Sequence, residues 1–448
     1  MGRWARWSRW LRPGVGLKRW LLVIFVGELL VAFAGALVLR QVYRAVAPEG
    51  PGQSTLLWLL TLQFLPLELR PVVLAGVGLL VFLVGLRRLV AVALEPFGQR
   101  REPLVELIYQ KRSLARGPRI VAVGGGTGLS VLLRGLKEHT SNITAVVAVA
   151  DDGGSSGRLR DELGIAPVGD LRNCIAALAD AEPEMARLLQ YRFPAGGEGR
   201  ETVRGHAFGN LLLAALSQIE GDFEEGVRQA NRVLAVRGRV VPAAPLPLTL
   251  HAELADGSLL AGQSRIARAA GIRRVWIEPA DAHATAEALE AVATADLVVL
   301  GPGSLYTSLL PSLLIPELRQ ALSVCRAPRV YVANVATQVG ETQGYTLAEH
   351  LAALEAHGLA GAVDAILAND ERVMPLSLRA VVRAPADPLP VRVDLPRDPA
   401  ARPRLVVLDV VDRQDPHHHD PALLADALLA TLEAWPAAPL PSPAARSA

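Results

Sequence analysis

The sequence predicts an α/β chain: a Rossmann-like, doubly wound, mainly parallel sheet with helical and β-hairpin insertions, preceded by two transmembrane helices. Two observations predict the sheet. Short apolar, β-branched runs alternate with helical patterns from Pro118 onward, and glycine-rich or polar turns follow several of those runs. A third observation predicts the membrane segments, because the first 90 residues contain long apolar runs flanked by arginines.

We expect five parts in this chain of 448 residues. They are a basic, Trp-rich cytosolic arm (1–19), a two-span membrane anchor (20–90), a charged linker (91–117), a nucleotide-binding α/β domain (118–436) and a disordered tail (437–448). The net charge of +2 lacks the basic excess of a nucleic-acid-binding protein, so no nucleic acid is expected as a partner.

The first apolar run, 20–39, is interrupted only by Glu28 and is long enough to cross a bilayer. A signal peptide is the alternative, but this run is longer than the apolar part of one, and a second run follows at 71–86. Arginines and lysines crowd the outer flanks of the two runs. The positive-inside rule therefore predicts a multi-pass protein of the inner (plasma) membrane with its main domain in the cytoplasm. The stretch 56–67 leaves open an interfacial or re-entrant piece, since a third span would put the domain outside.

Strands are expected in the α/β domain wherever apolar runs recur between helical patterns. They are 119–123, 144–150, 239–242, 248–254, 274–278, 297–300, 329–334, 365–368 and 404–408. The stretch 170–234 is predicted to be a long helical block without a strand. The stretch 248–261 is predicted to be an inserted hairpin around Asp256-Gly257.

The first glycine turn comes directly after the first strand. Gly124, Gly125 and Gly126 permit positive φ and close approach, Thr127 is expected to cap the following helix, and Gly128 lies in its first turn. Such a helix start attracts phosphate. The turn has neither GxGxxG nor Gly-Lys-Ser/Thr, so a turn without a ligand remains the alternative.

Asp151 and Asp152 end the second strand, where open α/β sheets bind ligands. Such a pair can hold Mg²⁺, bond a ribose hydroxyl or accept a proton. The small residues that follow, including Ser155 and Ser156, offer donors to phosphate, with Arg158 and Arg160 as anion partners. An Asp-Gly turn with a helix cap is the alternative.

Two further motifs come from the helical block. Asp170 is expected at a helix cap, with Arg172 and Asn173 in the first turn. His206 and Asn210 are four residues apart and are expected on one helix face, where a structural and a functional histidine are equally compatible with the pattern.

A second small-residue turn, Gly301, Pro302, Gly303 and Ser304, follows another buried strand, where the other half of a nucleotide would lie. Tyr306 is expected to stack on a base or sugar. The next strand is followed by polar groups suited to hydroxyl or amide recognition: Asn334, Thr337, Gln338, Glu341 and Thr342.

Taken together, these motifs resemble the gluconeogenesis-factor (YvcK-type) branch of the 2-phospho-L-lactate transferase (CofD-like) family. The resemblance rests on GGGTGLS, ADDGGSSGRLR, GDLRNC, GHAFGN, GPGSLYTS and GETQGYT, which occur between residues 124 and 346. It implies binding of a UDP-sugar such as UDP-N-acetylglucosamine, or of another nucleoside diphosphate, and a role in cell shape, envelope synthesis and carbon metabolism. Envelope-synthesis proteins and a second copy of the chain are the implied partners.

The same resemblance implies which residues form the site. The two glycine turns would line the nucleotide, Asp151 and Asp152 would face its phosphates through Mg²⁺ and serve as catalytic groups, and Asn210 and Tyr306 would complete the pocket. The transferase branch implies an alternative activity: a Mg²⁺-dependent phospholactyl or phosphoryl transfer that releases a nucleoside monophosphate. No lysine lies beside either glycine turn to assist such a transfer. The triplet His417, His418 and His419 is predicted to be a solvated loop.

Overall fold

The computed structural model describes residues 112–180, 182–194, 203–370, 372, 388–398 and 401–436, together with isolated positions between 25 and 84. The chain divides into two compact units, Met1–Arg112 and Ser113–Ala448. Among the described residues, no helix has both the length and the apolar character needed to span a membrane. The predicted spans 20–39 and 71–86, the arm and the tail lie wholly or largely outside the described residues.

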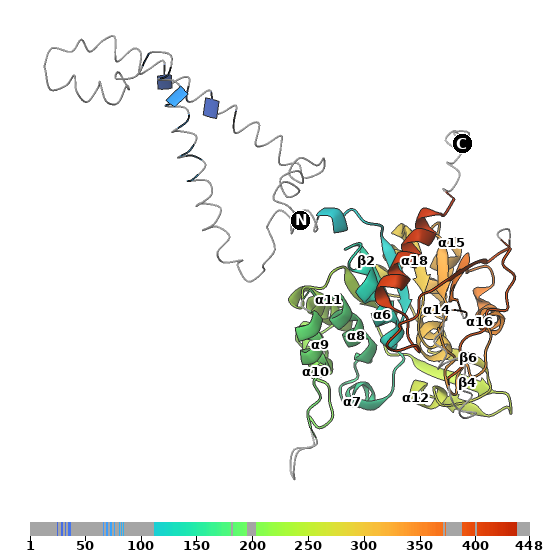
Figure 1. Ribbon diagram of the computed structural model, residues 1–448. Coiled ribbons are helices and arrows are strands. Elements are labelled where there is room, and N and C mark those ends of the chain that lie inside the picture. The colour runs from blue at the N-terminus through green and yellow to red at the C-terminus, as the bar shows by residue number, and fades with distance from the viewer. Residues whose placement is uncertain are drawn as a thin grey trace, which may run out of the picture. The chain divides into compact units, whose positions relative to one another are not determined.

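A seven-stranded sheet forms the centre of the second unit, in the order β10-β9-β8-β7-β1-β2-β3 (Figure 1). All neighbouring strands are parallel. The strands are β1 (Ile120–Gly124), β2 (Ile143–Val147), β3 (Arg239–Pro242), β7 (Leu297–Leu300), β8 (Arg329–Val332), β9 (Ala365–Asn369) and β10 (Arg404–Leu408). The predicted Rossmann-like, mainly parallel α/β fold is therefore confirmed.

The strand order contains one topological switch point. β1 pairs with β2 on one side and with β7 on the other, so the chain winds away from β1 in both directions. Ligands of open α/β sheets bind in the crevice outside the carboxyl ends of the strands at such a point. The turns that follow β1 and β7 meet at that crevice.

Helices cover both faces of the sheet, because right-handed crossovers that run in opposite directions place their helices on opposite sides. On one face α6 (Gly126–Leu136) packs against α8 (Gly169–Leu178) and α18 (Pro421–Glu433). On the other, α13 (Ala286–Thr294) packs against α15 (Pro316–Val324). The remaining helices are α7 (Gly154–Leu163), α9 (Glu182–Gln190), α10 (Phe208–Glu220), α11 (Phe223–Val233), α12 (Gln263–Ile266), η2 (Leu305–Leu309), α14 (Leu310–Leu313), α16 (Leu347–Leu354) and η3 (Glu355–Leu359).

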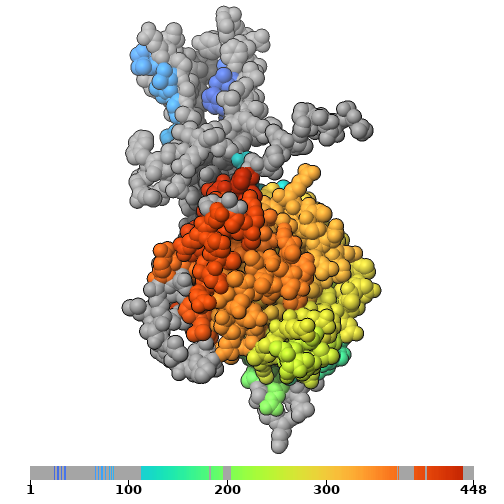
Figure 2. Space-filling view, turned by 90° about the vertical axis from the view of Figure 1, so that its right-hand side faces the viewer, coloured from blue at the N-terminus to red at the C-terminus, as the bar shows by residue number. Residues whose placement is uncertain are grey.

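A second, antiparallel sheet has the order β5-β4-β6 and lies at the surface of the unit (Figure 2). Its strands are β4 (Thr249–Leu254), β5 (Leu259–Ala261) and β6 (Ile272–Glu278). The antiparallel pairing of β4 with β5 confirms the predicted hairpin. β6 pairs with β4 and not with the main sheet, and exposed or half-buried residues separate its buried ones, as in a sheet with one solvated face.

Candidate functional site

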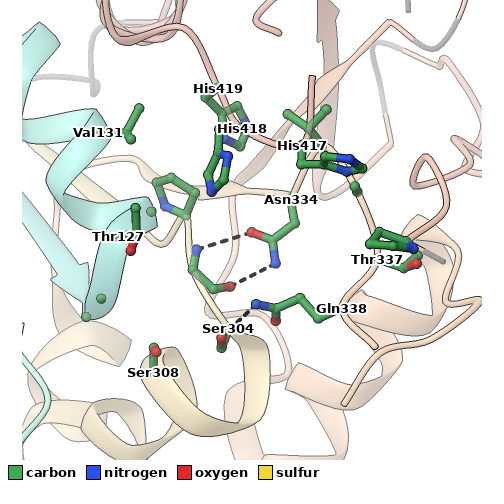
Figure 3. Close-up of a pocket in the computed structure, with 18 of the residues that line it drawn as sticks. Thr127, Val131, Ser304, Ser308, Asn334, Thr337, Gln338, His417, His418 and His419 are labelled. Atoms are coloured by element: carbon green, nitrogen blue, oxygen red, sulfur yellow. Dashed lines mark hydrogen bonds between the residues drawn. The ribbon is translucent and has the colours of Figure 1, made fainter. Parts of the chain in front are cut away.

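A cavity of about 390 Å³ lies at the switch point, between the turns that follow β1 and β7 (Figure 3). Five segments line it: the start of α6, the turn after β7, the segment after β8, the stretch at Pro388, and a loop ahead of α18. The lining residues are Gly125, Gly126, Thr127, Gly128, Val131, Pro302, Gly303, Ser304, Ser308, Asn334, Val335, Ala336, Thr337, Gln338, Val339, Pro388, His417, His418 and His419.

The first wall is the turn from β1 into α6. Gly124 is the last residue of the strand, Gly125 is the extended N-cap residue, and Gly126 opens the helix at φ +67°. The prediction that Thr127 caps α6 is wrong, because no side chain caps this helix and Thr127 lies in its first turn. Thr127 instead faces the cavity (Figure 3), beside backbone N–H groups that lack intrahelical partners.

At Gly125 and Gly128 neighbouring atoms leave no space for a side chain, so both positions require glycine. A Cβ on Gly125 would collide with the Asp170 carboxyl, and a Cβ on Gly128 would lie 2.8 Å from the Pro302 carbonyl oxygen. The two glycine turns therefore touch each other directly through their main chains.

The second wall is the turn after β7, and side chains from beyond β8 hold its shape. Asn334 accepts from the Gly303 N–H through Oδ1 at 3.2 Å and donates to the Gly303 carbonyl through Nδ2 at 2.9 Å. Gln338 donates from Nε2 to Ser304 Oγ at 2.7 Å (Figure 3). The Oε1 atom of Gln338 is buried and has no hydrogen-bond partner in the described part of the chain. Predicted polar groups thus form part of the site.

Tyr306, predicted to stack on a nucleotide, lies behind this wall. It is only 2% exposed, its hydroxyl lies 3.1 Å from that of Tyr345, and its ring packs edge-on against Tyr345 and His357. In this conformation the ring does not line the cavity. Its backbone N–H donates to Glu341, which also accepts from the Thr307 hydroxyl. Burial raises the pKa of Glu341 to about 7.

The third wall is the histidine loop, His417–His419, which Figure 3 shows across the cavity from Ser304 and Ser308. The loop immediately precedes Asp420, whose side chain caps α18. The main-chain carbonyl of Pro421 lies so close to Gly135 of α6 that a Cβ there would overlap it. This contact holds the histidine loop over the first glycine turn.

The prediction of a solvated histidine loop missed this placement. One signal in the sequence could have found it. The triplet follows the last strand of the same sheet by a few residues, and so belongs to the edge where all parallel strands place their carboxyl ends.

The side chains of Asp151 and Asp152, which were predicted to form one site, have different neighbours. Asp152 accepts from the Ser264 N–H at 2.8 Å and abuts Gly262, so it anchors the turn before α12. Asp151 instead neighbours Asp170, which lies in the first turn of α8 and not at its cap, since Val168 is the N-cap residue. Asp151 thus lies near both other carboxyls: the charge of Asp152 raises the pKa of Asp151, and the charge of Asp151 raises the pKa of Asp170.

Burial, followed by the charge of Asp151, raises the pKa of Asp170 to about 7, although Asp170 accepts from the Gly126 N–H. Burial also raises the pKa of Asp151. Two close, partly desolvated carboxyls suit a divalent cation, since oxygen ligands and a cationic charge would relieve both penalties. Among the described residues, no group of three or more His, Cys, Asp or Glu could hold a metal.

A hydrogen-bond network lies next to these carboxyls. It joins five further residues: Ser155, Arg172, Asn173, His206 and Asn210. The Ser155 hydroxyl lies 3.0 Å from His206 Nδ1 and accepts from Asn210 Nδ2 at 3.0 Å. Arg172 donates to the side-chain oxygens of Asn210 and Asn173, each at 3.0 Å.

His206 precedes α10, which begins at Phe208, so the prediction that His206 and Asn210 share a helix face is wrong. They meet on Ser155 because α10 starts beside α7. Ser156 Oγ also accepts from Asn210 Nδ2, at 3.4 Å. The predicted anion partners Arg158 and Arg160 donate to main-chain carbonyls, those of Arg204 and Leu248 respectively.

Comparison with known proteins identifies the family. The family model described as 2-phospho-L-lactate transferase CofD matches residues 120–408, which include both glycine turns and end before the histidine loop. The chain belongs to the CofD family. A relative from Nostoc sp. is 43% identical over 436 residues, covering 94% of this chain and 91% of the relative.

Within the CofD family, the chain falls among the gluconeogenesis factors, as the motifs predicted. The gluconeogenesis factor of Bacillus subtilis is 48% identical over 261 residues, which cover 58% of this chain and 81% of that protein. A crystal structure of a protein from Bacillus halodurans matches with a TM-score of 0.65 and 44% identity, covering 70% of this chain and 99% of that one. The Nostoc match includes much of residues 1–112, whereas these shorter matches do not require them.

Proposed function

We propose that this CofD-family protein binds a UDP-sugar, such as UDP-N-acetylglucosamine, and thereby regulates cell shape, envelope synthesis and carbon metabolism from the cytoplasmic face of the plasma membrane. One observation carries the proposal: the cavity lies at the switch point between two glycine turns, with the start of α6 exposed to it. Helix starts and small-residue turns are what a diphosphate requires.

The remaining walls suit the rest of such a ligand. The cavity volume of about 390 Å³ lies within the range of small-molecule sites. Thr337 and Gln338 line the side away from α6, where an amide-bearing base or sugar needs donors and acceptors. The unpartnered Gln338 Oε1 can accept one hydrogen bond from a ligand N–H or O–H.

A regulator needs partners as well as a ligand. We infer that residues 20–90 tether the chain to the membrane through two helices, that the protein self-associates, and that envelope-synthesis proteins respond to its ligand state. The name of the B. subtilis relative, gluconeogenesis factor, supports the link to carbon metabolism.

Isothermal titration of the full-length chain with UDP-N-acetylglucosamine, with and without Mg²⁺, tests the proposal. We expect saturable binding at one site per chain. Gly126→Arg should abolish it, because Gly126 opens α6 and lines the cavity. Gly154→Arg is the matched control: Gly154 opens α7, also at positive φ, but faces open space. Absence of binding in the presence of Mg²⁺ would sink the proposal.

The second candidate is a Mg²⁺-dependent transferase that acts on a nucleoside diphosphate-linked substrate. The buried pair Asp151 and Asp170 favours it, as does the description of the matched family model. In such a transfer a substrate hydroxyl attacks the phosphorus atom of the transferred phosphoryl group, and the bond from that phosphorus to the bridging oxygen of the diphosphate breaks. The hydroxyl proton passes to a base, and the nucleoside monophosphate leaves with the bridging oxygen. Mg²⁺ held by Asp151 and Asp170 would neutralise the charge on the phosphates.

Release of nucleoside monophosphate tests this alternative. We expect Asp151→Asn and Asp170→Asn to abolish release, whereas Asp152→Asn, whose carboxyl bonds Ser264, should reduce it less. If Asp152→Asn is the most damaging of the three, the assignment of the carboxylate pair is wrong.

A further inference from the structure

The cavity has an unusual charge composition for a site that takes a diphosphate. A UDP-sugar brings two negative phosphates, yet no lysine or arginine occurs among the described residues that line the cavity. The only ionisable side chains in that lining are the three histidines. Any positive side-chain charge in the described lining must therefore come from proton uptake by this loop.

The three histidines differ in what they can do. His419 is only 6% exposed and hydrogen-bonds the main chain of Ala333. Burial lowers its pKa to about 4, so it remains neutral at physiological pH. His417 is exposed on the cavity rim.

His418 is held in a defined orientation. Its Nδ1 lies 2.8 Å from Asp415 Oδ2. Its N–H donates to the Asp415 carbonyl at 2.9 Å, and its carbonyl accepts from the Asp412 N–H at 2.9 Å. An imidazole paired with a carboxylate through one nitrogen presents its other nitrogen in a fixed direction. Nε2 of His418 is therefore the nitrogen left for a ligand.

We propose that His418 is the anion contact of this cavity, and that the diphosphate of the bound ligand is held by the protonated His418–Asp415 pair. This inference rests on the proposed function for the class of ligand. It deepens that function, because ligand occupancy then depends on cytoplasmic pH as well as on ligand concentration.

The direction of the effect follows from the charges around His418. Asp415 faces it from its own loop, with His417 and neutral His419 on either side. The described lining contributed by α6, the turn after β7 and the segment after β8 contains no charged side chain. A protonated imidazole attracts the diphosphate and a neutral one does not, so binding takes up a proton and weakens as pH rises. We expect affinity to fall about tenfold between pH 6 and pH 8, the range in which imidazole side chains lose their proton.

Calorimetric titration of the full-length chain with UDP-N-acetylglucosamine at pH 6, 7 and 8 measures this effect. Its two phosphates are diesters and do not titrate in that range, so any pH dependence belongs to the protein. Repeating the titration in buffers of different ionisation enthalpy counts the protons taken up, and we expect about half a proton or more near pH 7. Uridine, which lacks phosphates, should show no such dependence.

Two substitutions of His418 test whether its positive charge or its shape is responsible for binding. His418→Gln should bind about tenfold more weakly than the wild type at pH 6, nearly as well at pH 8, and without proton uptake. His418→Arg should retain tight binding up to pH 8, because its charge is permanent. The control is His283→Gln, since His283 pairs with Glu317 through Nδ1 and neither residue lines the cavity. Matched thermal unfolding curves would show that each variant is folded.

Each remaining outcome overturns the inference in a distinct way. Tight, pH-independent binding by the wild type removes the proton contact and leaves the proposed function intact. If the His418→Gln variant still takes up a proton on binding, another group binds that proton, for instance His417 or Asp170 behind the glycine turn. Equal pH dependence for uridine shows that the phosphates are not the group contacted. Binding of neither ligand at any pH defeats the proposed function together with the inference.

Discussion

The main-chain carbonyl of Pro421 lies against Gly135, leaving no space for a side chain between α18 and α6. These residues are nearly 290 positions apart, yet their contact sets how close the histidine loop comes to the first glycine turn. The cavity therefore depends on a packing contact that no cavity residue makes.

Gly135→Ala should destabilise the domain and weaken ligand binding together. Alanine is the better helix former by about 1 kcal/mol. The added methyl would nevertheless overlap Pro421 and crowd Ala425, and overpacking costs about 1–3 kcal/mol. Urea denaturation and titration measure the two effects. Ala430→Ser, which adds one heavy atom on the exposed face of α18, is the control. A Gly135→Ala protein with unchanged stability would contradict the close contact.

Gly125→Ala should be destabilising because of Asp170 alone. The Gly125 backbone is extended, at φ −173°, a conformation that alanine adopts readily, but the new methyl would strike the Asp170 carboxyl. We expect a cost of about 1–3 kcal/mol in the wild-type background. In an Asp170→Ala background the same change should cost less than about 0.5 kcal/mol, which a double-mutant cycle measures. Additive effects would mean that another atom is responsible.

Asn334→Ala should weaken ligand binding because it releases the Gly303 backbone. Asn231 makes the same pair of bonds to Val240, with Nδ2 2.8 Å from its carbonyl oxygen and Oδ1 3.1 Å from its nitrogen, far from the cavity. Both alanine variants should lose about 1–3 kcal/mol of stability. Only Asn334→Ala should raise the dissociation constant for the nucleotide sugar. Equal binding by both variants would separate the turn from ligand recognition.

Glu341 should give the domain a stability that falls as pH rises. Because burial raises its pKa to about 7 from an ordinary value of 4.5, the folded state holds a proton that the unfolded state releases. The loss of folding free energy from ionising Glu341 builds up between these two pH values and is constant above them, at about 3 kcal/mol in total. Glu341→Gln should flatten that part of the curve when unfolding free energies are compared at pH 5 and pH 8. Parallel curves for the two proteins would contradict a buried, protonated Glu341.

The sheet could be predicted from sequence because its information is local. Four- and five-residue apolar runs predicted β3, β7 and β10 with their observed bounds, and the glycines after β1 and β7 marked the turns that line the cavity. β-branched runs and glycines have these conformational preferences wherever they occur.

The site was predictable only in part, because side-chain direction depends on distant contacts. Asp151 and Asp152 are adjacent in sequence, but Ser264 draws one away and α8 brings Asp170 to the other. His206 and Asn210 meet through Ser155 and not through a shared helix face. The histidine loop reaches the cavity because α18 packs on α6, a contact that no local pattern encodes.

Because a ribosome makes the chain from its N-terminus, the α6–α18 contact can form only late in synthesis. The glycine turn after β1 emerges early, but the wall formed by residues 417–419 is among the last parts of the domain to be synthesised, and it is held in place only once α18 has emerged and packed against Gly135. A nascent chain can therefore complete most of its sheet while the cavity still lacks a side. Only a finished chain therefore encloses the cavity, and a chain truncated after β10 would retain both glycine turns without the residues that close the cavity around them.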